Sequence, residues 1–396
     1  MEEWKEYRLG DIISISGGFA YKGELIGSGD NYLLSMGCVS FSENFLDKGA
    51  RQYAGESPDR FYAYPGDIVL ATRQQSDNLP ILGMPAIIPS KYEGHKMIVG
   101  ANLYRVDIKD KSFNNRFLYW LLKTPSYVNH IRSCQSGTTV RMITKANIED
   151  YIFYAPDKTT RDHISDFIWA LDDKIEVNRK INENLEQQAQ ALFKSWFVDF
   201  EPFKNGEFVE SELGMIPKGW RVEELENICT IKYGKGLGKN DLTQKGFPVF
   251  GGNGIIGFYT QYLYELPQIL VSCRGAASGK IIESLPKSYV TSNSLVLELK
   301  DRFYYNYLKF LLLSSPLYDY ATGSAQPQIT IDNIKGVKIL LPLQEAIQKM
   351  NPTLENIGNI QRANEQESHR IAELRDTLLP KLMSGELKVN EVENSL

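Results

Sequence analysis

Two arginines follow apolar segments at corresponding places in the chain, and their chemistry suits contact with nucleic acid. The segment Asp67-Ile-Val-Leu-Ala-Thr-Arg73 is matched 201 residues later by Gln268-Ile-Leu-Val-Ser-Cys-Arg274. A guanidinium can donate to O6 and N7 of a guanine together, which contributes about 1 to 3 kcal/mol of discrimination between bases. An ion pair on the protein surface would explain an arginine after a strand equally well. The sequence leaves both interpretations of Arg73 and Arg274 open.

Further candidate contacts lie in short loops of glycine and small polar residues. Glycines in segments 17–22 and 233–239 allow the backbone to approach phosphate closely, and these segments also carry lysines and aromatic rings. Segments 136–141 and 323–328 correspond to each other and carry arginine or glutamine. Solvated turns, or turns into the next strand, are the structural alternative. The predicted nucleic-acid contacts are Lys22, Arg73, Gln74, Arg141, Lys145, Lys232, Lys235, Lys239, Arg274, Lys280, Gln326 and Gln328.

The charge of the chain is unevenly distributed. The formal net charge is −5, whereas nucleic-acid-binding domains are usually basic. Residues 230–290 nevertheless hold seven basic residues against three acidic ones, while residues 157–201 hold six against ten. An acidic chain can therefore still present a basic face, provided that its acidic segments do not touch phosphate.

The motifs of enzymes that act on DNA are incomplete. A methyltransferase needs an Asn-Pro-Pro-aromatic type of motif to hold the flipped base, and Asn351-Pro352-Thr353 does not supply it. Residues 275–281 are one residue short of a phosphate-binding loop and end on isoleucine, which favours a turn before a strand. Glu298-Leu-Lys300 has no suitable upstream aspartate to complete a metal-dependent nuclease site, so charges at a strand end are the preferred interpretation. We therefore predict no catalytic residue in this chain.

The four cysteines and four histidines are scattered along the sequence. The cysteines form no C-x-x-C pair, and the histidines have no partner four residues away. Neither a disulfide framework nor a metal site is therefore predicted.

Self-similarity organises the whole chain. The pattern Trp4-x4-Leu9-x2-Ile12 returns as Trp220-x4-Leu225-x2-Ile228, at an offset of 216 residues. The offset falls to 201 at the two arginines and settles at 186 from Gly137 onward, where Gly137 matches Gly323. The simplest interpretation is two copies of one unit that have diverged most in their globular parts.

Each copy changes character at a proline, Pro156 or Pro342. Before it, short apolar runs between glycine and proline turns predict strands, and residues 115–123 and 305–313 predict one helix per copy. After it, apolar residues recur in alternating steps of four and three, a period of 3.5 that is typical of a coiled coil. An amphipathic helix packed on its own domain is the alternative for either helix alone, but two matched runs favour a pair.

Polar residues occupy the middle of each heptad seam. These residues are Asn178 and Asn182 in the first helix and Asn364 and Ser368 in the second. They would fix the register of the pair, because a shifted pairing would bury an amide against leucine. Antiparallel pairing places Asn182 opposite Asn364 and Asn178 opposite Ser368, and parallel pairing swaps these partners. We favour the antiparallel pair, since the first helix ends in the second domain, whose own helix must return. The predicted fold class is therefore α+β, with two similar globular domains separated by an antiparallel coiled coil in a pseudo-two-fold repeat.

Several motifs resemble the specificity subunits of type I restriction-modification systems, over essentially the full length of the chain. They are Leu192-Phe-Lys-Ser-Trp-Phe-Val-Asp-Phe-Glu-Pro202, Glu212-Leu-Gly-Met-Ile-Pro-Lys-Gly-Trp220, Leu378-Leu-Pro-Lys-Leu-Met-Ser-Gly-Glu-Leu387, and the matching loops Ser136-Gly-Thr-Thr-Val-Arg-Met-Ile143 and Gly323-Ser-Ala-Gln-Pro-Gln-Ile-Thr330. The resemblance implies target-recognition domains at residues 1–156 and 206–342. It also implies helical regions at residues 157–205 and 343–396.

The resemblance carries further expectations about partners and cofactors. It implies that the chain reads an asymmetric, bipartite target in double-stranded DNA and docks two modification subunits, which methylate adenine with S-adenosylmethionine. Restriction subunits that use ATP and Mg²⁺ can join such a complex. The chain itself is expected to bind no cofactor, to have no membrane segment and to be cytoplasmic, because its charged start and lack of a long apolar run fit neither a secretory signal nor a span. A non-enzymatic scaffold for protein or sugar is the rival function, which would not explain the motifs.

Overall fold

The computed structural model describes residues 4–74, 80–137, 140–323 and 326–394. Contacts divide the chain into unit 1, residues 1–177 and 366–396, and unit 2, residues 178–365. Two long helices, α5 (Lys158–Phe197) and α9 (Gln344–Ser384), each contribute one half to either unit. The domain boundaries predicted from the sequence stay a prediction, because this division cuts both helices near their middle.

Unit 1 combines short strands with short helices in its N-terminal part. Its strands are β1 (Lys5–Arg8), β2 (Ile13–Gly17), β3 (Ile26–Leu34), β4 (Ala50–Tyr53), β5 (Tyr62–Ala63), β6 (Ile68–Ala71), β7 (Arg73–Gln74), β8 (Pro85–Ile87), β9 (Met97–Val99), β10 (Leu103–Ile108), β11 (Arg141–Met142) and β12 (Ile152–Ala155). Its short helices are α1 (Leu9–Ile12), α2 (Asn115–Leu121), α3 (Pro125–Cys134), α4 (Lys145–Glu149) and, near the C-terminus, α10 (Val389–Glu393).

Unit 2 repeats this composition. Its strands are β13 (Phe208–Ser211), β14 (Gly214–Pro217), β15 (Arg221–Glu224), β16 (Cys229–Tyr233), β17 (Phe247–Gly251), β18 (Gly254–Tyr259), β19 (Ile269–Ser272), β20 (Ile281–Glu283), β21 (Tyr289–Val290), β22 (Ser294–Leu299) and β23 (Lys338–Leu341). Its short helices are α6 (Leu225–Ile228), α7 (Tyr305–Ser314) and α8 (Ile331–Ile334).

The two units share one sheet plan. The order β2-β10-β6-β8 in unit 1 corresponds to β16-β22-β19-β20 in unit 2. A second sheet has the order β4-β3-β9-β5 in unit 1 and β18-β17-β21 in unit 2, and it contains one parallel pair in each case, β3 with β9 and β17 with β21. The central strands β6 and β19 are buried along their whole length, as their unbroken apolar runs require. The predicted α+β class is thereby confirmed.

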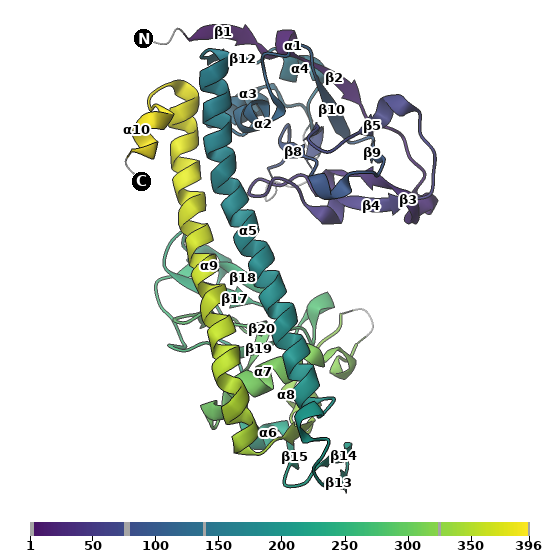
Figure 1. The fold of residues 1–396 in the computed structure, drawn as a ribbon, viewed down its shortest axis with the longest axis vertical. Coiled ribbons are helices and arrows are strands. Elements are labelled where there is room, and N and C mark those ends of the chain that lie inside the picture. Colours follow the sequence, from purple (N-terminus) through teal and green to yellow (C-terminus); the bar gives the residue numbers. More distant parts are fainter. Residues whose placement is uncertain (1–3, 75–79, 138–139, 324–325, 395–396) are drawn as a thin grey trace. The chain divides into compact units, whose positions relative to one another are not determined.

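The long helices pair through side-chain amides in unit 2. Asn364 Nδ2 donates to Asn182 Oδ1 at 2.8 Å, and Asn182 Nδ2 donates to the Gln361 carbonyl at 3.0 Å. Asn178 donates to the Asn364 carbonyl at 3.4 Å. As residue numbers rise along α5, the numbers of the partner residues on α9 fall, so the two helices run antiparallel, as predicted (Figure 1). Asn182 lies opposite Asn364. The pairing of Asn178 with Ser368 stays a prediction.

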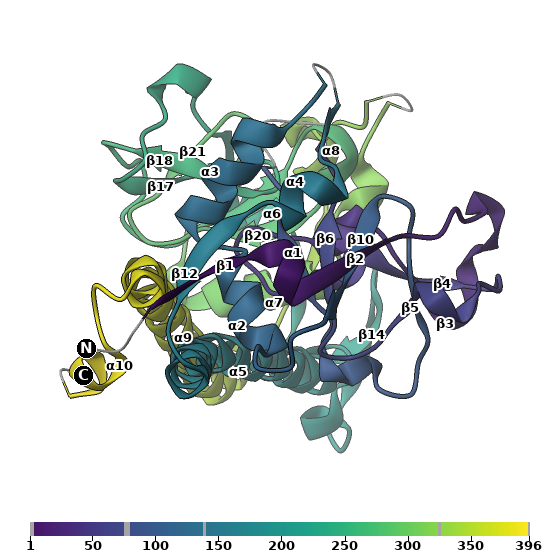
Figure 2. The same ribbon diagram turned by 90° about the horizontal axis from the view of Figure 1, so that it is seen from above.

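The halves of the same helices in unit 1 pair through charge. Arg375 forms an ion pair with Asp172, and both side chains are less than a tenth exposed. Lys174 Nζ lies 3.1 Å from Glu367 Oε2, again in antiparallel register, and Figure 2 shows α5 and α9 side by side from a second direction. The heptad pattern did not reveal the burial of Asp172, which is 7% exposed.

Each unit has its own apolar core, to which its halves of the long helices contribute. In unit 1, Ile164 and Ile168 of α5 join Leu382 of α9 against the buried residues of α2. In unit 2, Phe193 of α5 and Leu354 of α9 join the buried residues of α7. No helix in the described ranges is long and apolar enough to cross a membrane.

Candidate nucleic-acid interface

In unit 1 the predicted arginine lies where the central strand ends. After β6, the Thr72 N–H donates to the Asn102 carbonyl at 3.1 Å, which ties this end to the start of β10. The next two residues form β7 and pair with β11, so that Arg73 lies opposite Met142 and Gln74 opposite Arg141. Two segments that the sequence analysis selected separately are thus brought together.

Unit 2 builds the same arrangement with other residues. The Cys273 N–H donates to the Asn293 carbonyl at 3.0 Å, and Arg274 forms a backbone bridge with Gln328. The Gly275 N–H donates to the Pro327 carbonyl at 2.9 Å. Arg274 and the loop that contains Gln328 therefore lie side by side, as Arg73 and β11 do in unit 1.

These hydrogen bonds confirm the repeat alignment at the site. Met142 pairs with Arg73 in unit 1, and Gln328 pairs with Arg274 in unit 2. Met142 and Gln328 are 186 residues apart and the two arginines are 201 residues apart, the offsets found in the sequence. The same loop position therefore meets the same strand position in both copies. Both arginine side chains are exposed. Within the described residues, which omit 75–79 near Arg73, no ion pair of either guanidinium occurs. The interpretation of Arg73 and Arg274 as ligand contacts stays a prediction.

The other candidates of unit 1 differ in their surroundings. Lys145 is exposed, and its Nζ lies 5.8 Å from the ring centroid of Tyr104. Burial raises the pKa of Tyr104, and the charge of Arg73 opposes that shift, which places Arg73 near the same ring. Gln74 is 6% exposed and its Oε1 accepts from the Leu82 N–H at 3.3 Å, so it has a structural role. Lys22 lies beside the second sheet, where its N–H donates to Tyr53 Oη at 3.3 Å.

Arg141 is half-buried and is tied to the site through the backbone of β11. Residues 138 and 139 of its loop lie outside the described residues, as do residues 324 and 325 of the corresponding loop in unit 2. Gln326 and Gln328, which flank that second gap on its C-terminal side, are exposed.

The lysines of unit 2 divide into those at the arginine site and those elsewhere. Lys280 Nζ donates to Asn253 Oδ1 at 2.6 Å, and the backbone of Lys235 bridges to Thr291, two residues before Asn293. Lys232 forms an ion pair with Glu298 at 2.6 Å, so its charge is already compensated. Lys239 is exposed at the start of a short 3-10 helix, residues Lys239–Asp241.

Two asparagines that the sequence patterns did not reveal occupy the same place in both units. Asn102 and Asn293 each supply the carbonyl that holds the residue before the arginine, and their side chains are half-buried and exposed, respectively. They stand at an offset of 191 residues, in the segments Gly100-Ala-Asn102-Leu103 and Thr291-Ser-Asn293-Ser294. A repeat alignment at this intermediate offset would have found them.

The imagined nuclease motif is a structural strand end. Glu298 lies in β22 and pairs with Lys232, and Lys300 Nζ donates to the Glu226 carbonyl at 2.8 Å. Burial, with Glu298 nearby, raises the pKa of Tyr264 to about 12. The described residues contain no group of histidines, cysteines or carboxylates that could hold a metal ion. The side chains at the two arginine sites can donate hydrogen bonds to a ligand.

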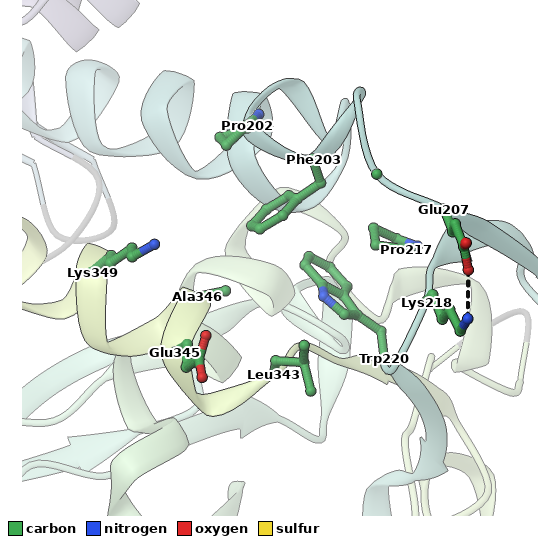
Figure 3. A pocket seen from close by; sticks show the side chains of 11 residues that line it. Pro202, Phe203, Glu207, Pro217, Lys218, Trp220, Leu343, Glu345, Ala346 and Lys349 are labelled. Carbon is green, nitrogen blue, oxygen red and sulfur yellow. Dashed lines mark hydrogen bonds and ion pairs between the residues drawn. The ribbon is translucent and has the colours of Figure 1, made fainter.

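A separate cavity of about 440 Å³ lies in unit 2, where α5 ends and α9 begins (Figure 3). Phe203 and Trp220 meet edge to face in its lining, with ring centroids 5.1 Å apart, and Leu343 lies beside Trp220. Lys218 and Glu207 form an ion pair of 2.5 Å at its edge. This lining suits an apolar side chain of a ligand or partner.

Comparison with known proteins relates the whole chain to DNA-specificity proteins. The profile of the family described as "Type I restriction modification DNA specificity domain" matches residues 1–187 and 217–374. The type I restriction enzyme MjaIX specificity subunit of Methanocaldococcus jannaschii is 29% identical, over 70% of this chain and 70% of the relative. The HindI specificity subunit of Haemophilus influenzae is 25% identical, over 98% of this chain and 100% of the relative. The crystal structure of the S subunit of a type I restriction-modification system from M. genitalium matches with a TM-score of 0.57, at 16% identity and over 96% of both chains, which is a likeness of fold.

Proposed function

Because this chain belongs to the type I restriction-modification DNA specificity family, whose profile matches both repeats, we propose that its two units read the two halves of an asymmetric, bipartite DNA target. As a member, the chain is the non-catalytic specificity subunit of such a system and assembles into a type I complex with DNA. The observation that carries the proposal is the exposed arginine at the end of the central strand in each unit, Arg73 or Arg274.

The two arginine sites support half-sites of different sequence. An arginine at such a position can donate to guanine O6 and N7 in the major groove. The groups around it differ, with Arg141 and Lys145 in unit 1 and Lys280 and Gln328 in unit 2. One scaffold with two sets of side chains would read two sequences, which makes the target asymmetric.

The continuity of α5 and α9 from one unit into the other supports a role in setting the gap between half-sites. Adding one heptad to both helices would lengthen each by about 10 Å, which is roughly three base pairs of DNA at 3.4 Å each. A spacer that grows while both half-sites keep their sequence is the expected result. An unchanged spacer in a complex that still methylates DNA would contradict this role.

The catalytic chemistry belongs, in this proposal, to partner subunits. Two modification subunits would bind the helical regions and methylate adenine with S-adenosylmethionine, and restriction subunits using ATP and Mg²⁺ could join them. The apolar cavity beside Trp220 and the exposed Val177 and Ile181 of α5 supply surface for such contacts. Action on cellular DNA would place the chain in the cytoplasm.

The direct test is methylome sequencing of cells that express this chain with its modification subunit, compared with cells that lack the chain. A gapped, asymmetric motif methylated on both strands only when the chain is present is expected. Exchange of residues 1–156 for those of another specificity subunit should change one half-site only. Unchanged methylation with an active, bound modification subunit would overturn the proposal and favour a scaffold.

A further inference from the structure

The tip of the β17–β18 hairpin is fixed against the arginine site of unit 2. The Thr291 N–H donates to the Phe250 carbonyl at 2.9 Å, and Ser294 Oγ donates to the Gly251 carbonyl at 3.1 Å. A Cβ on Gly252 would lie 3.1 Å from Ser272 Oγ and 3.2 Å from the Asn293 carbonyl, so the tip packs directly on the end of β19. The exposed Asn253 at this tip is therefore held beside the strand end that leads to Arg274.

Lys280 positions the side chain of Asn253. Its Nζ donates to Asn253 Oδ1 at 2.6 Å, a hydrogen bond from a charged donor. An ammonium has three donors and no acceptor, so the amide oxygen is the atom that it must meet. The amide nitrogen adds two further donors. Together the two side chains present mainly hydrogen-bond donors. Their one acceptor, Asn253 Oδ1, already accepts from the Lys280 ammonium.

We propose that Lys280 and Asn253 read a guanine in the half-site of unit 2, an inference that rests on the proposed function above. In the major groove guanine presents two acceptors, O6 and N7, whereas adenine presents an N6 donor beside its N7 acceptor. An asparagine that reads adenine must accept from N6 through its carbonyl oxygen. The ammonium of Lys280 beside that oxygen disfavours a second donor, so the pair selects guanine over adenine.

Unit 1 has the same turn without the cation. The Gly83 N–H donates to the Ala71 carbonyl and the Gly279 N–H to the Ser272 carbonyl, and both glycines have positive φ, 71° and 97°. The residue after the glycine is Met84 in unit 1, which is 1% exposed, and Lys280 in unit 2. The Lys280–Asn253 pair is thus an addition to a shared scaffold, as expected of a feature that reads one half-site only.

The test uses the intact chain assembled with its modification subunit, S-adenosylmethionine and a DNA library randomised across both half-sites. Lys280→Met places the residue of unit 1 at this position and uncovers the Asn253 oxygen. We expect the preference at one position of one half-site to shift from guanine toward adenine by roughly tenfold or more. Asn253→Asp keeps an acceptor for Lys280 but loses the amide donors, and should reduce the guanine preference at the same position.

Lys287→Met is the matched control, because it removes a lysine of the same basic segment whose charge lies 3.7 Å from Glu265. It should leave every base preference unchanged. The half-site read by unit 1 reports within each sample whether the complex is assembled and active. Equal loss of methylation for all four bases in Lys280→Met would indicate a phosphate contact and overturn the inference, as would an unchanged guanine preference. Absence of any gapped motif with the unaltered chain would instead overturn the proposed function.

Discussion

The two units differ little in backbone and much in the side chains at the end of the central strand. The hydrogen bond from Thr72 to Asn102 in unit 1 recurs from Cys273 to Asn293 in unit 2, at 3.1 and 3.0 Å. At the neighbouring bridge, however, Phe19 of unit 1 is replaced by Lys235 of unit 2. Backbone bonds and apolar cores maintain the shared scaffold, while the exposed positions are free to diverge. This separation explains how one fold, duplicated, can present two different reading surfaces.

The paired helices show a second difference between the units. Unit 1 holds its half with the buried pair Asp172 and Arg375, whereas unit 2 holds its half with the amides of Asn182, Asn364 and Gln361. A buried charge left without its partner is far more costly than an unpaired amide. The two halves should therefore respond very differently to the loss of one side chain.

The largest effect is expected from Asp172→Ala in unit 1. It leaves Arg375, whose side chain is 8% exposed, without its buried partner, although the ion pair with the exposed Asp376 remains. The free energy of unfolding should fall by about 3 kcal/mol. Asn364→Ala in unit 2 should cost only about 1 to 3 kcal/mol. Urea denaturation of the two variants measures the difference.

Asp166→Ala, on the same helix as Asp172, is the control for that comparison. The ion pair of Asp166 with Arg116 of α2 is 66% exposed at the aspartate and should contribute less than about 1 kcal/mol. The double substitution of Asp172 and Arg375 by leucine should recover much of the lost stability, since no buried charge remains. Equal effects of Asp172→Ala and Asp166→Ala would refute the distinction between the two halves.

The next effect concerns the two arginines. Arg73→Ala and Arg274→Ala should each remove about 1 to 3 kcal/mol of base discrimination, and each in a different half-site. Methylation of a randomised library by the assembled complex measures both. If either variant weakened base discrimination in both half-sites, the prediction that the two units read their half-sites independently would be wrong.

A smaller loss of stability, equal in the two units, is expected at a helix cap that both units share. Thr144 and Thr330 cap α4 and α8 with the same capping box, in which Asn147 or Asn333 returns the bond. Thr144→Ala and Thr330→Ala should each lower stability by about 1 kcal/mol. Thermal melting that shows a loss several times larger in one unit would break the equivalence of the scaffold at this point.

A pH dependence of stability is the last expected difference between the units. Burial lowers the pKa of Lys123 from 10.5 to about 8, with Arg375 adding to the shift and Asp172 opposing it. Between these two pKa values the unfolded chain binds more protons than the folded chain, so the contribution of this group to stability rises with pH across that window. Unit 2 has Leu313 at the corresponding place, so Lys123→Leu should abolish the rise. Urea denaturation at about pH 7.5 and 9.5 tests this, and parallel profiles of variant and parent would contradict it.

Much of the fold could be predicted because its signals are local or periodic. The helix α5 begins two residues after Pro156, and the apolar run before Arg73 forms the buried strand β6. The polar centre of the heptad seam predicted the contact between Asn182 and Asn364, once chain connectivity had favoured the antiparallel pair. The interpretation of residues 275–281 as a turn before a strand is likewise confirmed, with β20 beginning at Ile281.

The candidate site was predictable only in part. Arg73 and Arg141 were both selected, but nothing in their sequence neighbourhoods indicated that β7 and β11 would pair. Gln74 resembled a contact residue in sequence, yet its side chain is turned inward and bonds to the Leu82 N–H. Alternation along a strand sets which neighbours share a face, but a two-residue strand is too short to show it in the sequence.

The amino-acid sequence by itself determined that this protein is a duplicated unit with paired helices, because apolar periodicity and repeated spacing are properties of the chain alone. The tertiary structure decided which groups meet, such as Lys280 with Asn253 and Asp172 with Arg375. These partners are distant in sequence, and their contact depends on which turn lies beside which strand end and on the rotation of each helix. Both are set by the packing of the cores, which no local pattern encodes.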